Sequence, residues 1–129
     1  RRAIHQFEPM RQYLLQSGAD AEKMAKFEKK YPKTTHPIVR SHPITGEKSI
    51  YVNRLFTVGI EGMADAEAQP LLDKLFASAS QPEYQCRFRW RKHSIAFWDN
   101  RAAQHYATAD YYPHERVMER ATIEGDRPV

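Results

Sequence analysis

Three side chains near the end of the sequence have types and spacing that could bind a metal and organic acids. His105 follows an apolar run and a polar turn, and imidazole is a common ligand of transition metals. Arg116 and Arg120 lie in a segment, 116–123, that alternates like a β-strand. Period two would place both guanidinium groups on one face, with backbones roughly 13 Å apart at ~3.3 Å per residue. Two arginines facing a cavity would need anions, so the pattern is compatible with a site for a dicarboxylate and a second acidic molecule.

The same residues also admit a simpler interpretation. A lone histidine is more often satisfied by ordinary hydrogen bonds than bound to a metal. The face that carries the two arginines could equally be the solvated exterior of a sheet. From the pattern alone both interpretations stay open. Ordinary structural roles also suit the remaining histidines, which are His5, His36, His42, His93 and His114.

The surrounding sequence predicts the elements that would hold these residues. Helical spacing over residues 7–31, interrupted at Ser17-Gly18, predicts two helices, and an apolar stripe over 65–80 predicts a third that ends before Pro82. Two β-like runs within 36–53, joined by a turn at residues 43–47, predict a hairpin. Strands are predicted at 84–90, 94–98 and 116–123. This order favours a mainly β fold with helices, but five or six strands are fewer than the eight of a closed jelly roll.

Composition and charge narrow the function classes. The net charge is +4, yet no block of like charge marks a nucleic-acid-binding tail, so we expect no nucleic-acid partner. No apolar run approaches the ~20 residues of a membrane span. The single cysteine, Cys86, favours a reducing, cytoplasmic compartment. The start at Arg1-Arg2 has neither an initiator methionine nor a signal peptide, and we expect an interior piece of a chain about twice as long.

Ordered motifs over residues 35–128 resemble the C-terminal half of the taurine dioxygenase (TauD/TfdA) family. The resemblance covers nearly three quarters of the chain. Its motifs are His36-Pro37-Ile38-Val39-Arg40, His42-Pro43, Gly46-Glu47-Lys48, Tyr51-Val52-Asn53, Phe56-Thr57, Pro82-Glu83-Tyr84-Gln85, Trp98-Asp99-Asn100-Arg101, Gln104-His105-Tyr106-Ala107, Asp110-Tyr111, Arg116-Val117-Met118 and Arg120-Ala121-Thr122-Ile123-Glu124-Gly125-Asp126.

The resemblance implies a double-stranded β-helix that holds Fe(II) through two histidines and one carboxylate, with 2-oxoglutarate as cosubstrate. His105 matches the distal histidine ligand. The first histidine and the carboxylate belong to a His-x-Asp motif, and no histidine of this sequence has an acid two positions later. The resemblance therefore implies the C-terminal part of a jelly roll that is incomplete in this chain, with two iron ligands missing and the fragment inactive by itself.

The resemblance also implies further roles. Arg116 would bind the distal carboxylate of 2-oxoglutarate, Arg120 would bind the acidic group of the primary substrate, and Phe56 would form an apolar wall beside it. Trp98 would fill the core, and Asn100 would tie the turn before His105.

The implied reaction is hydroxylation of an acidic small molecule, in the first instance a taurine-like alkylsulfonate that then releases sulfite. The sequence departs from the family in two places: Glu119 replaces a histidine, and 57–60 reads Thr-Val-Gly-Ile where Thr-Thr-Arg-Ile is usual. The second departure is near the substrate loop and keeps an alkyl sulfate ester or an aryloxyalkanoate open as the substrate. From another class, a non-catalytic fragment or binding module remains an alternative.

The domain organisation follows from the same comparison. Residues 1–129 are expected to form the C-terminal portion of one domain, with a peripheral helical segment at 1–34 and half of the β-helix at 35–129, interrupted by the helix at 65–80. The expected partners are a small acidic substrate and further copies of the chain in a homo-oligomer.

Overall fold

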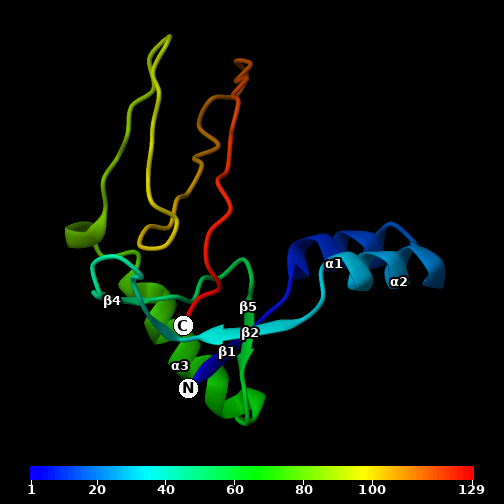
Figure 1. The fold of residues 1–129 in the computed structure, drawn as a ribbon. Coiled ribbons are helices and arrows are strands. Elements are labelled where there is room, and N and C mark those ends of the chain that lie inside the picture. Colours follow the sequence, from blue (N-terminus) through cyan, green and yellow to red (C-terminus); the bar gives the residue numbers. More distant parts are fainter.

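The computed structural model describes all residues 1–129, and its ordered part is a small three-stranded sheet covered by one helix. Strands β1 (Arg2–His5), β2 (Thr34–Pro37) and β5 (Thr57–Ile60) form an antiparallel sheet in the order β2-β1-β5. Helix α3 (Asp65–Ser78) lies against this sheet (Figure 1). A separate hairpin pairs β3 (Val39–Ser41) with β4 (Lys48–Ile50). These five strands make two small sheets, in which no double-stranded β-helix is visible.

The helices begin where local signals predict. Helix α1 (Glu8–Gln16) carries Pro9 in its first turn, where the missing N–H is not needed. The Asp20 side chain caps helix α2 (Ala21–Lys30) by accepting a hydrogen bond from the backbone N–H of Lys23 at 2.8 Å. The two helices extend together away from the sheet (Figure 1). The prediction of two helices within 7–31 is confirmed, as is that of a helix at 65–80, which ends two residues earlier.

A short turn closes the β3–β4 hairpin. Gly46, with φ of 74°, donates its N–H to the carbonyl of His42 at 2.9 Å, and this left-handed conformation costs glycine little. Val39 pairs with Ile50. The predicted hairpin within 36–53 is therefore confirmed, although it is shorter than expected. Residues 34–37 pair with β1 instead, as a separate strand.

The hydrophobic core lies between α3 and one face of the sheet. Ala3 is fully buried, and Ile60 and Leu72 are 1% exposed. The full set is Ala3, Ile38, Val52, Ile60, Ala68, Leu72 and Phe76. None of the helices combines the length and apolar character that a membrane crossing requires.

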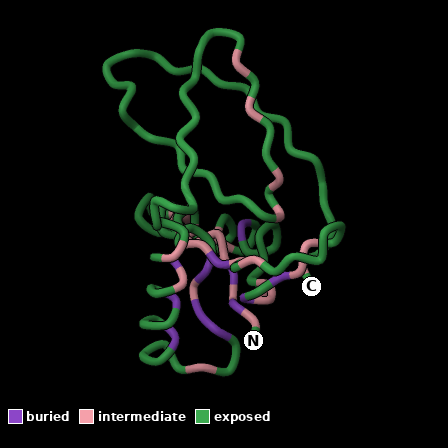
Figure 2. Tube along the Cα trace, turned by 90° about the vertical axis from the view of Figure 1, so that its left-hand side faces the viewer, coloured by how far each residue is buried: buried purple, intermediate pink, exposed green.

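The predictions of strands at 84–90, 94–98 and 116–123 are wrong. After the short 3-10 helix η1 (Pro82–Tyr84), the chain contains turns but no further helix or strand. Figure 2 shows this part as long excursions without a buried residue, and every buried residue lies before position 77. A strand is stabilised by a neighbouring strand, and the alternating segments have none among these residues.

Substituting Leu72 with alanine tests the core. We expect Leu72→Ala to lower the free energy of unfolding by about 2–5 kcal/mol, because it removes a side chain buried between α3 and the sheet. Urea denaturation would measure the change. The neighbouring Leu71, which is 37% exposed, provides the control: Leu71→Ala should cost much less, and equal losses for both variants would contradict this packing.

Candidate functional site

The segment that carries His105 is tied to the β3–β4 hairpin through Asp99. The Nδ1 atom of His42 accepts hydrogen bonds from the backbone N–H groups of Ile44 and Thr45, at 3.3 and 3.2 Å, so its proton is on Nε2. Nε2 then donates to Oδ2 of Asp99 at 3.1 Å. Arg101 donates to the same carboxylate from Nε and Nη2, at 2.9 and 2.7 Å. These bonds from Arg101, and then from His42, hold the pKa of Asp99 well below its usual range.

A second anchor immediately precedes His105. The Gln104 side chain donates from Nε2 to the carbonyl of Val52 at 2.9 Å, and Val52 is 1% exposed. Between the two anchors, the backbone N–H groups of Ala102 and Ala103 both bond the carbonyl of Asp99. The turn before His105 is thus fixed at both ends to the ordered part of the protein.

The imidazole of His105 lies beside the indole of Trp98. Their ring centroids are 5.1 Å apart, with an interplanar angle of 47°. The indole N–H of Trp98 donates to Oδ1 of Asn100 at 2.8 Å, as expected for a side chain that ties this turn. Trp98 is 37% exposed, so its interpretation as a core residue is wrong. His105 itself is exposed and available to a ligand.

The other predicted site residues make contacts that do not involve His105. Arg116 donates from Nη1 to the carbonyl of Thr108 at 2.9 Å, and its guanidinium lies 4.2 Å from the ring centroid of Tyr111. Arg120 is exposed and forms no side-chain hydrogen bond or ion pair. Phe56 is 37% exposed and packs against Phe7, with centroids 5.3 Å apart. No hydrogen bond or ring contact joins His105 to Arg116, Arg120 or Phe56, and their functional roles stay predictions.

A complete iron site does not fit these residues. No group of three or more histidine, cysteine, aspartate or glutamate side chains is arranged to hold a metal ion. His105 offers one imidazole, whereas the triad of non-haem iron oxygenases needs two histidines and a carboxylate. This chain can therefore contribute one ligand of such a site.

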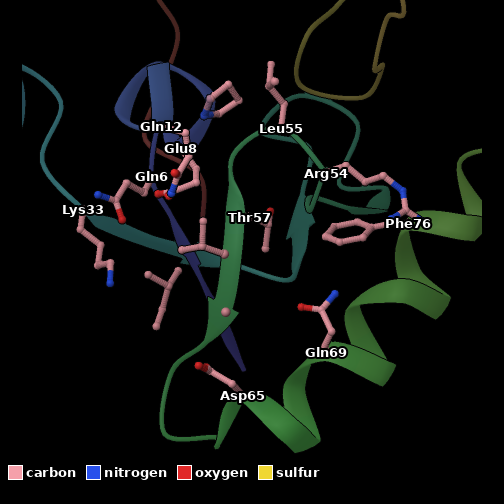
Figure 3. Close-up of a pocket in the computed structure, with 14 residues that line it drawn as sticks. Gln6, Glu8, Gln12, Lys33, Arg54, Leu55, Thr57, Asp65, Gln69 and Phe76 are labelled. Atoms are coloured by element: carbon pink, nitrogen blue, oxygen red, sulfur yellow. The ribbon is translucent and has the colours of Figure 1, made fainter. Parts of the chain in front are cut away.

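Sequence reasoning missed an open groove beside β5. The groove has a volume of ≈ 770 Å³ and runs between α1 and α3 (Figure 3). Its floor includes Thr57, Val58 and Gly59, and the last two are the positions of the 57–60 segment that depart from the taurine dioxygenase pattern. The groove is mostly polar, with Gln6, Glu8, Gln12, Lys33, Arg54, Asp65 and Gln69 among its lining residues. These segments are distant in sequence, so no motif could indicate the groove.

A buried polar cluster was also missed. The ring of His5 is 5.1 Å from that of His36 and 6.1 Å from that of Tyr51. Arg40, which is 3% exposed, places its guanidinium 5.0 Å from the centroid of Tyr51. Thr57 lies 3.4 Å from Nε2 of His5. Each histidine taken singly had fitted an ordinary role, and only the pairing of β1 with β2 brings them together.

Both histidines of this cluster are held neutral. Burial, and then the neighbouring His36, lower the pKa of His5 from 6.5 to about 4. The pKa of His36 is also lowered, first by burial and then by the positive charges of Arg127, Arg2 and Arg40. The sheet thus keeps two uncharged imidazoles beside several guanidinium groups.

Comparisons with known proteins all indicate the same family. The model of the taurine catabolism dioxygenase TauD, TfdA family matches residues 1–122. The chain is 41% identical over 96 residues to the alpha-ketoglutarate-dependent sulfate ester dioxygenase of Pseudomonas putida, covering 74% of this chain and 32% of that protein. It is 40% identical over 96 residues to the alpha-ketoglutarate-dependent sulfonate dioxygenase of Saccharomyces cerevisiae. That match covers 73% of this chain and 23% of the yeast protein.

A solved structure agrees with these relatives. The crystal structure of a taurine dioxygenase from Burkholderia xenovorans matches with a TM-score of 0.54 and 33% identity, over 78% of this chain and 38% of that one. The matched region thus spans about a third or less of the two curated relatives described above.

The Asp99 anchor can be tested by removing its charge. We expect Asp99→Asn to speed amide hydrogen exchange in peptides spanning 99–104 several-fold, because the bidentate bond with Arg101 is lost. Exchange followed by mass spectrometry would measure this. Asp110→Asn serves as the control, since Asp110 accepts only from the Thr108 hydroxyl. Unchanged exchange in Asp99→Asn would show that the anchor does not hold the turn.

The buried histidine His5 predicts a loss of stability in acid. The unfolded chain takes up a proton at His5 near pH 6.5, but the folded protein does so only near pH 4. Stability is therefore full above about pH 6.5 and falls between pH 6.5 and 4, by about 3 kcal/mol for His5 at ~1.4 kcal/mol per pKa unit. Urea denaturation across this range should show that the free energy of unfolding depends less on pH in His5→Gln than in the wild type. The exposed-site variant His114→Gln should keep the full dependence, and identical slopes would refute the assignment.

Proposed function

Because the chain belongs to the taurine catabolism dioxygenase TauD, TfdA family, we propose that it supplies the C-terminal part of an Fe(II)/2-oxoglutarate-dependent dioxygenase acting on an acidic small molecule. The supporting observation is the match of the family model over residues 1–122, together with about 40% identity to two alpha-ketoglutarate-dependent relatives.

His105 is the iron ligand that this chain contributes. Its exposed ring, next to Trp98 and after the Gln104 anchor, is consistent with this role. The two remaining ligands come from outside these 129 residues, since no histidine here is followed two positions later by an acid. Iron and 2-oxoglutarate supply the oxidising chemistry, and the protein supplies orientation and electrostatics.

Arg116 binds 2-oxoglutarate, and Arg120 binds the acidic primary substrate. The contacts of Arg116 with Thr108 and Tyr111 use Nη1 and one ring face, which leaves Nε and Nη2 for the distal carboxylate of 2-oxoglutarate. Arg120 has all five donors free for the anionic group of the primary substrate. Phe56, held against Phe7, provides the apolar wall beside that substrate.

The primary substrate carries a sulfonate or sulfate group. The relatives are named for a sulfate ester and for sulfonates, and the solved structure for taurine. These compounds share a tetrahedral –SO₃ end that a guanidinium fork can bind through two oxygens. A taurine-like alkylsulfonate, with sulfite release, is the first candidate. An alkyl sulfate ester is the second, favoured by the Pseudomonas putida relative.

A chimaeric enzyme tests these roles. The matched 96 residues of the Pseudomonas putida enzyme would be replaced by the corresponding residues of this chain. We expect turnover that disappears in His105→Ala, a KM for 2-oxoglutarate raised at least tenfold in Arg116→Ala, and a KM for the substrate raised at least tenfold in Arg120→Ala. These shifts follow from the loss of a charged hydrogen bond, which is worth about 1.5–3 kcal/mol.

Arg89→Ala, at an exposed position in the same region, is the control and should leave both KM values unchanged. Released sulfite would identify a sulfonate as the substrate, and released sulfate an ester. A folded chimaera that turns over equally well without His105 would contradict the assignment of the iron ligand. Equal KM values with and without Arg120 would contradict the assignment of the substrate-binding residue.

A further inference from the structure

Arg40 is a buried cation without an anionic partner. It lies on β3, is 3% exposed, and its Nε has no hydrogen-bond partner. No carboxylate, including the chain end at Val129, lies within salt-bridge distance of its guanidinium. Its one recorded side-chain interaction is with the face of the Tyr51 ring. A buried charge left in this state costs several kcal/mol, so the site favours any anion that can reach it.

His36 presents a second unsatisfied group beside the same ring. Its Nδ1 is buried and has no hydrogen-bond partner, and its ring lies 5.9 Å from that of Tyr51. Tyr51 is thus close to two side chains that each have a buried polar atom without a hydrogen-bond partner. Imidazole can carry its proton on either nitrogen, so Nδ1 is able to donate to an oxyanion.

Further positive charge surrounds this pair. Arg2 and Arg127 act on His36 together with Arg40, and the last residues of the chain return to β2 and β3 (Figure 1). Ser41, next to Arg40, donates its N–H to the carbonyl of Val129 at 3.1 Å, which fixes this return. Arg2 has one acidic neighbour, Glu61, whose Oε2 lies 4.0 Å from its Nε. Positive charge therefore predominates around His36, and neither Arg40 nor Arg127 forms an ion pair.

We propose that Arg40 and His36, with Arg127 beside them, form a binding site for an oxyanion such as sulfate, phosphate or a carboxylate. The guanidinium fork matches two oxygens of such a group, and Tyr51 supports the guanidinium from one face. A metal cation does not suit the same place, because three arginines would repel it.

This site differs from the residues proposed for dioxygenase chemistry. Arg116 and Arg120 lie in the exposed segment after η1, whereas Arg40 is fixed on a strand and buried. The site also differs from the groove beside β5, whose lining includes neither Arg40 nor His36. The proposed anion site therefore shares no residue with the groove or with the residues proposed for the reaction.

The oxyanion has two possible sources with the same chemistry. It can be a free ion, or it can be a carboxylate side chain from a second copy of this chain. A free ion would bind saturably to one protein molecule. A carboxylate from a second copy would make self-association depend on Arg40.

The first arm of the test is a titration with sodium sulfate at constant ionic strength, balanced with sodium chloride. Nitrogen NMR of ¹⁵N-labelled histidine side chains would follow the wild-type protein. We expect a saturable shift of the His36 imidazole and none at His114, with thermal unfolding rising over the same concentrations. General salting-in or salting-out effects of sulfate would instead move stability without saturation.

Two substitutions of equal charge separate specific from general effects. Arg40→Gln should weaken sulfate binding at least tenfold, whereas Arg87→Gln, at an exposed position without a side-chain partner, should bind like the wild type. If Arg40→Gln fails to fold, Arg40→Lys keeps the charge but loses the bidentate fork and should still bind several-fold more weakly. The titration of the wild-type protein tests for saturable binding at His36 even if neither variant folds.

The second arm is sedimentation velocity at two protein concentrations. A dimer that is lost in Arg40→Gln, kept in Arg87→Gln and dissociated by sulfate would identify a carboxylate of a second copy as the occupant. The proposal is overturned if sulfate gives no saturable shift at His36 and self-association does not depend on Arg40. It is also overturned if sulfate affects both glutamine variants equally.

Discussion

The pairing of β1 with two neighbours is the interaction on which the ordered part of this protein depends. Ala3 pairs with His36 on one side and with Ile60 on the other, so one short strand joins segments from distant parts of the sequence. Ala3 is fully buried because α3 packs over this centre with Leu72. If β1 were removed, the sheet would separate into two unpaired strands, and α3 would lose the surface that buries its apolar stripe.

The same requirement for a partner explains the exposed segment that follows. Phe88, Trp90 and Ile123 alternate with polar neighbours, yet they are 52%, 46% and 81% exposed. Alternation makes a segment suited to a sheet, but the hydrogen bonds of a neighbouring strand are needed to form one. In their absence the turn before His105 is held by side chains, at Asp99 and Gln104, and not by a ladder of backbone bonds.

Sequence signals for helix starts and tight turns were reliable, whereas alternation did not predict strands and non-local pairing was not visible. The Asp20 cap and the turn at Gly46 act within a few residues, and the elements that they mark were predicted. Strands β1 and β5 are four residues long and owe their structure to partners far away in the sequence, so neither was predicted. His105 was identified by resemblance to a family, and its anchors could then be found in the structure. The cluster of His5, His36 and Arg40 was not predicted, because each residue taken alone is compatible with an ordinary structural role.

The neutral histidines and the unpaired arginine of this cluster are coupled, because the charge on one changes the energy of charging the other. Holding His36 uncharged lowers the repulsion that Arg40 and Arg127 would otherwise meet, and burial enforces that neutrality. An oxyanion at the proposed site would act in the opposite direction, since negative charge favours the protonated imidazole and would raise the pKa of His36. By linkage, proton uptake at His36 must then strengthen anion binding by the same free energy. Acid sensitivity and anion affinity are therefore coupled properties of one buried cluster, built by the pairing of β1 with β2 and its contact with the β3–β4 hairpin.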